Sequence, residues 1–428
     1  MTKIKPFKAY IYNQERFKDI SGLVCPPYDV ISSLEQDYYY ELGPYNFIHL
    51  LLGKDIPNQD KYEQAGSLLK KWLKDKVLIQ DNDPAIYFYS QEYNLKGERK
   101  TRLGFISLLK LPDNDPSVFG HENTRAEAKE DRLRLIRKVN ANLSPIFMVS
   151  KDTKRIIQRI YEQYIRDAQA FIDLTDKEKT RHQLWRVTSL EVLNMVEFGM
   201  QKEVAFIADG HHRYEVSSIY RDEMMKGLGK QFTGEESFNY TLAYFTNTDS
   251  RALAILRIHR LFKLDKTIDL DELLIKIRKY FDVEEIKDKT RFFFLMEKGG
   301  CSEHVLGMYK NKGFWLLRLK NIKLLDKILS DKPKEYRTLD VVILNRLIFE
   351  DILGSNFDSK ENITFSPDAQ DLIKSVDKNN LSIAFFLNPV KMQQITEVAL
   401  KGNKMPPKST YFFPKVLSGL VVNKHGEF

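Results

Sequence analysis

"EVAFIADGHHRYEVSSIYRDEMMKGLG", residues 203–229, is the stretch that decides the fold of this chain. Its first part is a short apolar run that ends at Asp209 and Gly210, as expected for a buried strand bounded by a turn. The remainder has helical periodicity and stops at two glycines, Gly227 and Gly229. The stretch therefore predicts a strand, a sharp turn and a helix in direct succession.

The rest of the chain alternates between predicted helices and predicted strands. Apolar residues at helical spacing predict helices over residues 60–75, 128–145 (stopped by Pro145), 152–172, the later part of 185–201, 271–281, 339–353 and 390–402. Apolar and aromatic runs predict strands over residues 85–94, 102–111, 238–247, 291–300 and 381–389. Two further strands are predicted within 304–320, where a KNKG turn joins them. Residues 44–53 are predicted as a strand because polar and apolar residues alternate there. We therefore predict a mixed α/β (α+β) fold.

The composition is ordinary for a soluble globular protein, with a hydrophobic share of 43% and a charged share of 29%. The formal net charge of +8 is spread along the chain, which favours anionic small molecules and forms no basic arm for nucleic acid. Cys25 and Cys301 are too few for a disulfide framework or a four-cysteine zinc site. No run approaches the roughly 18 apolar residues of a membrane span. We expect a cytoplasmic protein without membrane or nucleic-acid partners, in an oligomeric state that stays open.

The turn after the predicted strand gathers groups that suit an anion. Gly210 lets the backbone turn sharply into the helix, whose first N–H groups point toward any phosphate placed there. His211, His212 and Arg213 add side-chain donors, while Asp209 suits a magnesium ion or a substrate hydroxyl. We predict Asp209, His212 and Arg213 as catalytic residues. Gly210 and His211 are predicted to bind phosphate.

A simpler interpretation is that Asp209 caps the helix and that both histidines are solvated residues of its first turn. Capping requires neither paired histidines nor an arginine, so we favour the anion site. A zinc site is disfavoured, because adjacent helical residues diverge by about 100° whereas ligands on one helix face need i, i+4 spacing, as in HExxH.

A second polar patch lies in FGHENTRAEAKEDRLRLIRKVNANLSPIF, residues 119–147. His121, Glu122 and Thr124 fall in its loop, before the predicted helix. A carboxylate beside histidine and arginine is placed to accept a proton near an anionic substrate, so Glu122 is a predicted catalytic residue. His121 and Thr124 are predicted phosphate ligands. The charged residues over 129–137 suit a site and a solvated, salt-bridged helix face equally well.

Further polar residues lie in shorter motifs. Tyr28 and Asp29 belong to CPPYDVIS, a loop stiffened by two prolines, and are predicted to bind substrate. His259 and Arg260, in ILRIHRLF, receive the same prediction. Lys415, in TYFFPKVLSGLV, is a predicted phosphate ligand, although a surface position is the default for lysine.

Several nucleotide and hydrolase motifs are absent from the sequence. It contains no GxxxxGK[ST] loop, no GxGxxG after a strand and no GxSxG elbow. These absences disfavour a standard nucleotide-loop kinase, a dinucleotide dehydrogenase and an ordinary α/β hydrolase.

The ordered set CPPYDVIS, YNFIHL, GHENT, KEDRLRLIRKVNANLSPIF, FIADGHHRYEVSSIYRDE, IHRLF and YFFPKVLSGLV resembles the bacterial and archaeal family catalogued as domain of unknown function 1015. ADGHHRYE also resembles the signature of free-serine kinases in the ParB and sulfiredoxin-like superfamily. This resemblance implies a ParB/sulfiredoxin-like core within a larger, mixed-sheet, multi-domain chain. We expect an N-terminal α/β region over 1–150 that contributes site loops, a ParB-like phosphate-binding core over 151–262, and a C-terminal α+β region over 263–428.

By position, the kinase resemblance assigns Asp209 to a metal or the hydroxyl, Gly210 to phosphate, and the following histidines and Arg213 to the transferred group. It implies a magnesium-dependent kinase that converts free L-serine to O-phosphoserine with ATP, ADP or pyrophosphate as donor. Glu122 and Asp29 stay alternatives for the catalytic carboxylate. Two other functions stay open: a phosphohydrolase of the phosphoserine phosphatase type, and a nucleotide-binding regulatory protein without enzymatic activity.

Overall fold

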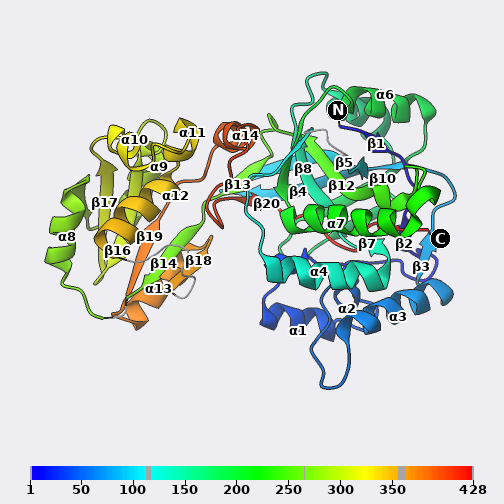
Figure 1. Ribbon diagram of the computed structural model, residues 1–428, viewed down its shortest axis with the longest axis horizontal. Helices are drawn as coiled ribbons and strands as arrows, with labels where there is room; N and C mark the ends of the chain where they lie inside the picture. Colours follow the sequence, from blue (N-terminus) through cyan, green and yellow to red (C-terminus); the bar gives the residue numbers. More distant parts are fainter. Residues whose placement is uncertain (1, 112–116, 265, 355–361, 427–428) are drawn as a thin grey trace. The chain divides into compact units, whose positions relative to one another are not determined.

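The computed structural model describes the chain except for residues 1, 112–116, 265, 355–361 and 427–428. It divides into two compact units, unit 1 with residues 1–120, 124–254 and 414–428, and unit 2 with residues 121–123 and 255–413. Both units combine helices with sheets (Figure 1), which confirms the predicted mixed α/β class. Strands of the predicted regions 1–150 and 151–262 share one sheet of unit 1, and the division into three functional regions stays a prediction.

Unit 1 is built on a mixed sheet that has nine strands among the described residues, in the order β6-β11-β8-β12-β5-β4-β10-β9, with β1 beside β5. β11 runs parallel to β6 and antiparallel to β8, and β8 runs parallel to β12. The strands are β1 (Ile4–Lys5), β4 (Ile86–Leu95), β5 (Glu98–Lys110), β6 (Val118–Phe119), β8 (Ile146–Ser150), β9 (Ile172–Thr175), β10 (Arg181–Val187), β11 (Ala205–Asp209) and β12 (Tyr240–Asn247). Two smaller pairs join β2 (Tyr10–Tyr12) to β3 (Leu78–Gln80) and β7 (Ala141–Asn142) to β21 (Asn423–Lys424).

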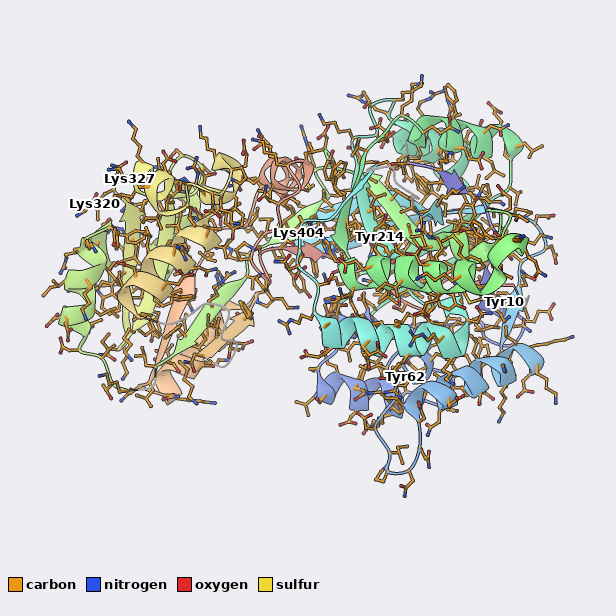
Figure 2. All side chains as sticks on the ribbon, in the orientation of Figure 1. Tyr10, Tyr62, Tyr214, Lys320, Lys327 and Lys404 are labelled. Carbon is orange, nitrogen blue, oxygen red and sulfur yellow. The ribbon has the colours of Figure 1, made fainter. Side chains whose placement is uncertain are left out.

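The helices of unit 1 are α1 (Ser33–Glu41), α2 (Ile48–Leu51), α3 (Lys61–Lys74), α4 (Ala126–Val139), α5 (Ile156–Ile160), α6 (Leu190–Met200) and α7 (His211–Leu228). One apolar core joins the sheet to α5 and α6, and a second joins α4 to α7. α3 packs on α4 in turn (Figure 1). Tyr62 of α3 donates a hydrogen bond to Asp131 of α4 at 2.7 Å, and Figure 2 labels this tyrosine.

Most predicted elements of unit 1 are confirmed, and the strongest case is the β11–α7 succession itself. The predicted helix over 60–75 is α3, which begins because the Asp60 carboxylate accepts from the N–H of Tyr62 at 2.8 Å. The predicted strand pair at 85–94 and 102–111 is the β4–β5 hairpin.

Three predictions in unit 1 are wrong in extent or type. α4 ends at Val139, before Pro145, because Asn140 takes a left-handed conformation with φ of +49° and the chain continues into β7. The helix predicted over 152–172 covers only α5 and a π-helical turn, η2 (Tyr161–Ile165). The strand predicted over 44–53 is wrong, because Asn46 Oδ1 accepts from the N–H of Ile48 at 2.9 Å and starts the short helix α2.

Unit 2 is built on a sheet that has six strands among its described residues, in the order β15-β17-β16-β19-β14-β18. These are β14 (His259–Lys263), β15 (Phe281–Ile286), β16 (Val305–Lys310), β17 (Gly313–Leu319), β18 (Ile363–Ser366) and β19 (Ser382–Phe386). Its helices are α8 (Leu270–Arg278), α9 (Lys289–Gly299), α10 (Lys323–Ile328), α11 (Lys334–Arg337), α12 (Asp340–Ile343), the π-helix η5 (Leu344–Ile352), α13 (Ala369–Lys378) and α14 (Met392–Leu400). The short strands β13 (Ala254–Leu256) and β20 (Tyr411–Phe413) lie at the two ends of the long segment of this unit.

The strand predicted over 291–300 is wrong, because this segment is helix α9. The Asp288 side chain accepts from the N–H of Arg291 at 2.7 Å and caps the helix. Phe292, Met296 and Gly299 recur at helical spacing and are buried. The aromatic run therefore packs one face of a helix against the sheet.

Candidate active site

The turn between β11 and α7 has the geometry that the sequence predicted. β11 ends at Asp209, and Gly210 precedes α7 with φ of +93°, a conformation that other residue types rarely adopt. A Cβ atom at Gly210 would lie 2.8 Å from Cζ of Arg213. Glycine is therefore required here both by the backbone angle and by the neighbouring guanidinium group.

Lys415 and Arg213 converge on the carboxylate of Asp209. Nζ of Lys415 lies 2.5 Å from Oδ1, and Nη2 of Arg213 lies 2.5 Å from Oδ2. All three side chains are 11% exposed, so water and salt screen their charges little. Arg213 also donates through Nη1 to the carbonyl of Pro145. Two cations meet one carboxylate at the positive end of the α7 dipole, an arrangement that suits an anion.

The position of Lys415 is fixed by β4 and β5. Nη2 of Arg102 donates to the carbonyl of Pro414 at 2.6 Å, and Nε2 of Gln91 donates to the carbonyl of Lys415 at 2.8 Å. Arg102 is fully buried, and its guanidinium lies 4.4 Å from the ring centre of Phe147. The backbone of residues 414–415 is thus held by buried side chains of the central sheet.

The loop before α4 reaches the same end of α7. Nε2 of His212 accepts a hydrogen bond from the N–H of Arg125 at 3.0 Å, so this ring nitrogen carries no proton in the described arrangement. Thr124 Oγ1 donates to Oε2 of Glu215 at 2.6 Å, and Nζ of Lys129 lies 3.2 Å from the same oxygen. The first contact links the Thr124 loop to α7, and the second links α4 to α7.

A cavity of about 60 Å³ lies beside this cluster, and Arg213 lines it together with Arg132, Tyr28, Ser217 and Thr241. At about 10–15 Å³ for each water, it has room for roughly four to six waters, the scale of a small amino acid. The Arg132 guanidinium lies 4.2 Å from the ring centre of Tyr28. Burial raises the pKa of the Tyr28 phenol, and Arg132 and Arg213 oppose that shift. The cavity is therefore small, partly polar and bordered by two arginines.

His121 and Glu122 belong to unit 2. His121 is buried, its Nε2 lies 3.0 Å from Oγ1 of Thr410, and its carbonyl accepts from the N–H of Met405 at 2.7 Å. Glu122 pairs with Met405 in a short parallel bridge. The proposal that His121 binds phosphate and Glu122 acts as base with Asp209 stays a prediction.

His259 and Arg260 are buried in β14 of unit 2. Nδ1 of His259 accepts from the N–H of Leu387 at 3.2 Å, and burial with nearby Arg257 and Arg260 lowers the pKa of His259 to about 3. Arg260 donates to the carbonyl of Ile258 at 2.9 Å. These bonds account for the local fold, and the substrate-binding role of both residues stays a prediction.

The carboxylate of Asp209 is already paired in the described arrangement. Both carboxylate oxygens accept from cationic side chains, so a metal would have to displace Lys415 or Arg213. No group of three or more His, Cys, Asp and Glu side chains within the described ranges is arranged to hold a metal. Mg²⁺ usually binds through one or two carboxylates together with substrate phosphates and waters. The metal role of Asp209 stays a prediction.

The family model described as "Protein of unknown function (DUF1015)" matches residues 4–342. The chain belongs to this family. No curated protein matches the DUF1015 chain. None of its described helices combines the length and apolar character needed to cross a membrane.

Solved structures similar to this DUF1015 protein share little sequence with it. A mutant free serine kinase in complex with AMP is 11% identical at a TM-score of 0.35, covering 70% of this chain and 88% of its own. SbnI with C-terminal truncation from Staphylococcus aureus is 12% identical at a TM-score of 0.36, covering 74% and 86%. A conserved hypothetical protein from Pyrococcus furiosus is 12% identical at 0.33, covering 72% and 92%.

The structure brings together most of the predicted site residues of unit 1, namely Asp209, Gly210, His212, Arg213, Thr124 and Lys415, with Tyr28 at the adjoining cavity. His211 is buried as the first residue of α7, and Asp29 is exposed in the short 3₁₀ turn η1 (Tyr28–Val30). The catalytic and binding roles of all these residues stay predictions.

The sequence interpretation assigned no role to four residues that shape this DUF1015 site: Arg102, Glu215, Ser217 and Thr241. Arg132 belongs to the charged run over 129–137, for which a site and a solvated helix face stayed equal alternatives. Arg102 carries a signal, since it is an arginine at the head of an otherwise apolar strand run. Glu215 ends the DGHHRYE motif one helical turn after His211, so its proximity to the site follows from spacing. Ser217 and Thr241 carry no comparable signal.

Proposed function

We propose that this DUF1015 protein transfers a phosphoryl group to the hydroxyl of free L-serine. The observation that carries the proposal is the convergence of Lys415 and Arg213 on Asp209 at the start of α7, beside a cavity of the scale of a small amino acid. The DGHHR sequence, which resembles that of free-serine kinases, supports the choice of substrate.

Phosphoryl transfer depends mainly on alignment and on neutralising the charge of the transferring group. The donor phosphate would draw Lys415 and Arg213 away from Asp209, because a phosphate carries more charge than one carboxylate. These two cations and the N–H groups at the start of α7 would then stabilise the three oxygens of the phosphoryl group.

Release of Asp209 from its cations gives the reaction its base. The serine hydroxyl oxygen attacks the terminal phosphorus, and the bond from that phosphorus to the bridging oxygen of the donor breaks. The donor leaves with that electron pair. The hydroxyl proton passes to the Asp209 carboxylate, which then returns it to solvent.

The test is formation of O-phosphoserine, detected by mass spectrometry. Purified protein is incubated with L-serine and ATP, ADP or pyrophosphate in turn, each with magnesium and with a chelator. Product from at least one donor is expected. Absence of product with all three donors would remove the kinase proposal, and release of inorganic phosphate from O-phosphoserine without a donor would indicate a phosphohydrolase instead.

Asp209→Asn is the decisive variant. The amide keeps the size of the side chain but can neither take the proton nor pair with two cations, so turnover should fall by about 10²–10⁴-fold. Asp222→Asn is the matched control, because Asp222 lies on the same helix and pairs with Arg221 at 2.8 Å. Equal turnover in both variants would contradict the role of Asp209.

A further inference from the structure

The cavity beside Arg213 has walls that are more apolar than free serine requires. Leu135, Ile136 and Val139 line it from one face of α4, and all three are buried. The other apolar residues of the lining are also buried, namely Leu51 of α2, Ala141 of β7, Leu143, and Val216 of α7. The cavity therefore offers apolar contacts from α2, α4, β7 and α7.

The serine and threonine hydroxyls of this lining already have partners within the protein. Oγ of Ser217 donates to the carbonyl of Arg213 at 2.9 Å and lies 3.0 Å from Oγ1 of Thr241. Oγ of Ser144 lies 2.6 Å from Oγ of Ser418. These hydrogen bonds occupy hydroxyl groups that a polar ligand would otherwise meet, so the cavity is less polar than its residue types indicate.

Arg213 joins the cavity to the candidate active site. It lines the cavity, and its Nη2 lies 2.5 Å from Oδ2 of Asp209. A substrate hydroxyl that gives its proton to Asp209 would lie beside Arg213, and the substituent on the same carbon would be the nearest other group of the substrate. In serine this carbon carries only hydrogen besides the hydroxyl, whereas in threonine it also carries a methyl group. The methyl group is the part of a hydroxy amino acid that suits an apolar cavity at this position.

A methyl group gains free energy by entering such a cavity. An apolar cavity without an occupant forfeits dispersion contacts on its lining, and the methyl group leaves water when it fills the space. Burial of one such carbon corresponds to a dissociation constant that is lower by about fourfold. The cavity should therefore distinguish two amino acids that differ by this group.

We propose that the acceptor site binds L-threonine more tightly than L-serine, with the threonine methyl group in the apolar cavity. This inference rests on the proposed function for the choice of a hydroxy amino acid as acceptor. The transfer step is the one given for serine. The threonine hydroxyl oxygen forms the new bond to phosphorus, the bond to the bridging oxygen of the donor breaks, and the hydroxyl proton passes to Asp209.

Calorimetric titration of the full chain without a phosphoryl donor measures this preference and requires no turnover. L-Threonine should bind about fourfold more tightly than L-serine. L-allo-Threonine, which has the opposite configuration at the carbon that bears the hydroxyl, should bind no more tightly than L-serine. Equal affinity for threonine and serine, equal affinity for the two threonine isomers, or no binding of any of them would overturn the proposal.

Val216→Ile extends a lining side chain into the cavity and should bring the ratio of serine to threonine dissociation constants close to one. Val139→Ile fills the cavity from α4 and serves as a second variant should the first fail to fold. Val192→Ile is the matched control, because Val192 is also a buried helical valine but lies on α6, outside the lining. The control should keep the preference for threonine. A preference that persists in both cavity variants would show that the methyl group binds elsewhere.

Mass spectrometry of the products separates this proposal from the kinase proposal. With a donor that supports O-phosphoserine formation, L-threonine should give O-phosphothreonine at a higher kcat/KM than L-serine gives O-phosphoserine. Tighter binding of threonine without either product would support the cavity assignment and remove the kinase proposal. O-Phosphoserine formation together with equal affinities would support the kinase proposal and overturn the cavity assignment.

Discussion

Gly210 determines the geometry of the candidate active site more directly than any charged residue. Its positive φ turns the chain from β11 into α7, and the absence of a side chain lets the Arg213 guanidinium approach the turn. The position of Arg213 sets the charge around Asp209, since the two side chains are in contact. A residue without functional groups of its own thereby positions the groups that carry the chemistry.

Replacing Gly210 with alanine should have two effects, a loss of stability from backbone strain and a weaker affinity for pyrophosphate from the displaced Arg213. Gly210→Ala should cost roughly 1–2 kcal/mol of unfolding free energy from the left-handed conformation, and its Cβ should push Arg213 off Asp209 and weaken pyrophosphate binding about tenfold. Gly97→Ala is the control, because Gly97 has φ of +82° but no atom within 4 Å of an added Cβ. Urea unfolding and calorimetric titration measure the two effects. Equal pyrophosphate affinity in both variants would contradict the role of the close contact.

Because His425 is buried, we predict that the free energy of unfolding falls in acid. Burial, together with nearby Lys424, lowers the pKa of His425 from 6.5 to about 4. The unfolded chain therefore binds a proton at this residue below about pH 6.5 while the folded chain stays neutral to about pH 4, so stability falls as the pH drops through this window. The loss should reach up to about 3 kcal/mol.

His425→Phe should remove this contribution and keep the ring that stacks on Tyr220 at 5.7 Å. The measurement is the midpoint of urea unfolding at a series of pH values. Native and variant stabilities should diverge between the two pKa values, with the variant losing less in acid. Parallel curves across the window would show that His425 titrates normally in the folded chain.

At the level of elements, the sequence predicts those helices and strands whose type is set by a local pattern of residues. β11 and α7 were predicted because a short apolar run, a glycine and a helical period follow each other directly. α9 was predicted as a strand because three successive phenylalanines obscure the helical spacing of Phe292 and Met296. The contact between Lys415 and Asp209 joins residues far apart in the chain, so it follows from the sheet order and from no local pattern.

One substitution tests whether the hydrogen bond from Arg102 of β5 to the carbonyl of Pro414 fixes the Lys415 segment. Arg102→Met would leave the buried carbonyl of Pro414 without its donor, which should cost about 1–3 kcal/mol of unfolding free energy. It should also speed hydrogen exchange over residues 415–417. Arg99→Met, on the same strand with a side chain that is 68% exposed, should change stability by less than about 0.5 kcal/mol. An equal loss in both variants would mean that Arg102 contributes only as a strand residue.

At the scale of the whole molecule, the fold class is easier to predict from the sequence than the set of segments that forms each compact unit. The sequence predicts the mixed α/β class, and none of its local patterns indicates that residues 414–428 belong to unit 1. The named strand of that segment, β21, is two residues long, and its partner β7 lies far away in the sequence. Which segments form one compact unit depends on contacts between residues that are far apart in the sequence, and local periodicity carries no information about such contacts.

The return of the chain to unit 1 at residue 414 has a consequence for biosynthesis. The ribosome makes Asp209 and Arg213 within a few residues of each other, but the lysine that also pairs with Asp209 is made only after residues 255–413 have been translated. At ordinary elongation rates this interval is on the order of ten to thirty seconds. Until residue 415 is made, Asp209 has Arg213 but not Lys415 beside its carboxylate, so the two-cation arrangement is completed only by the third segment of unit 1.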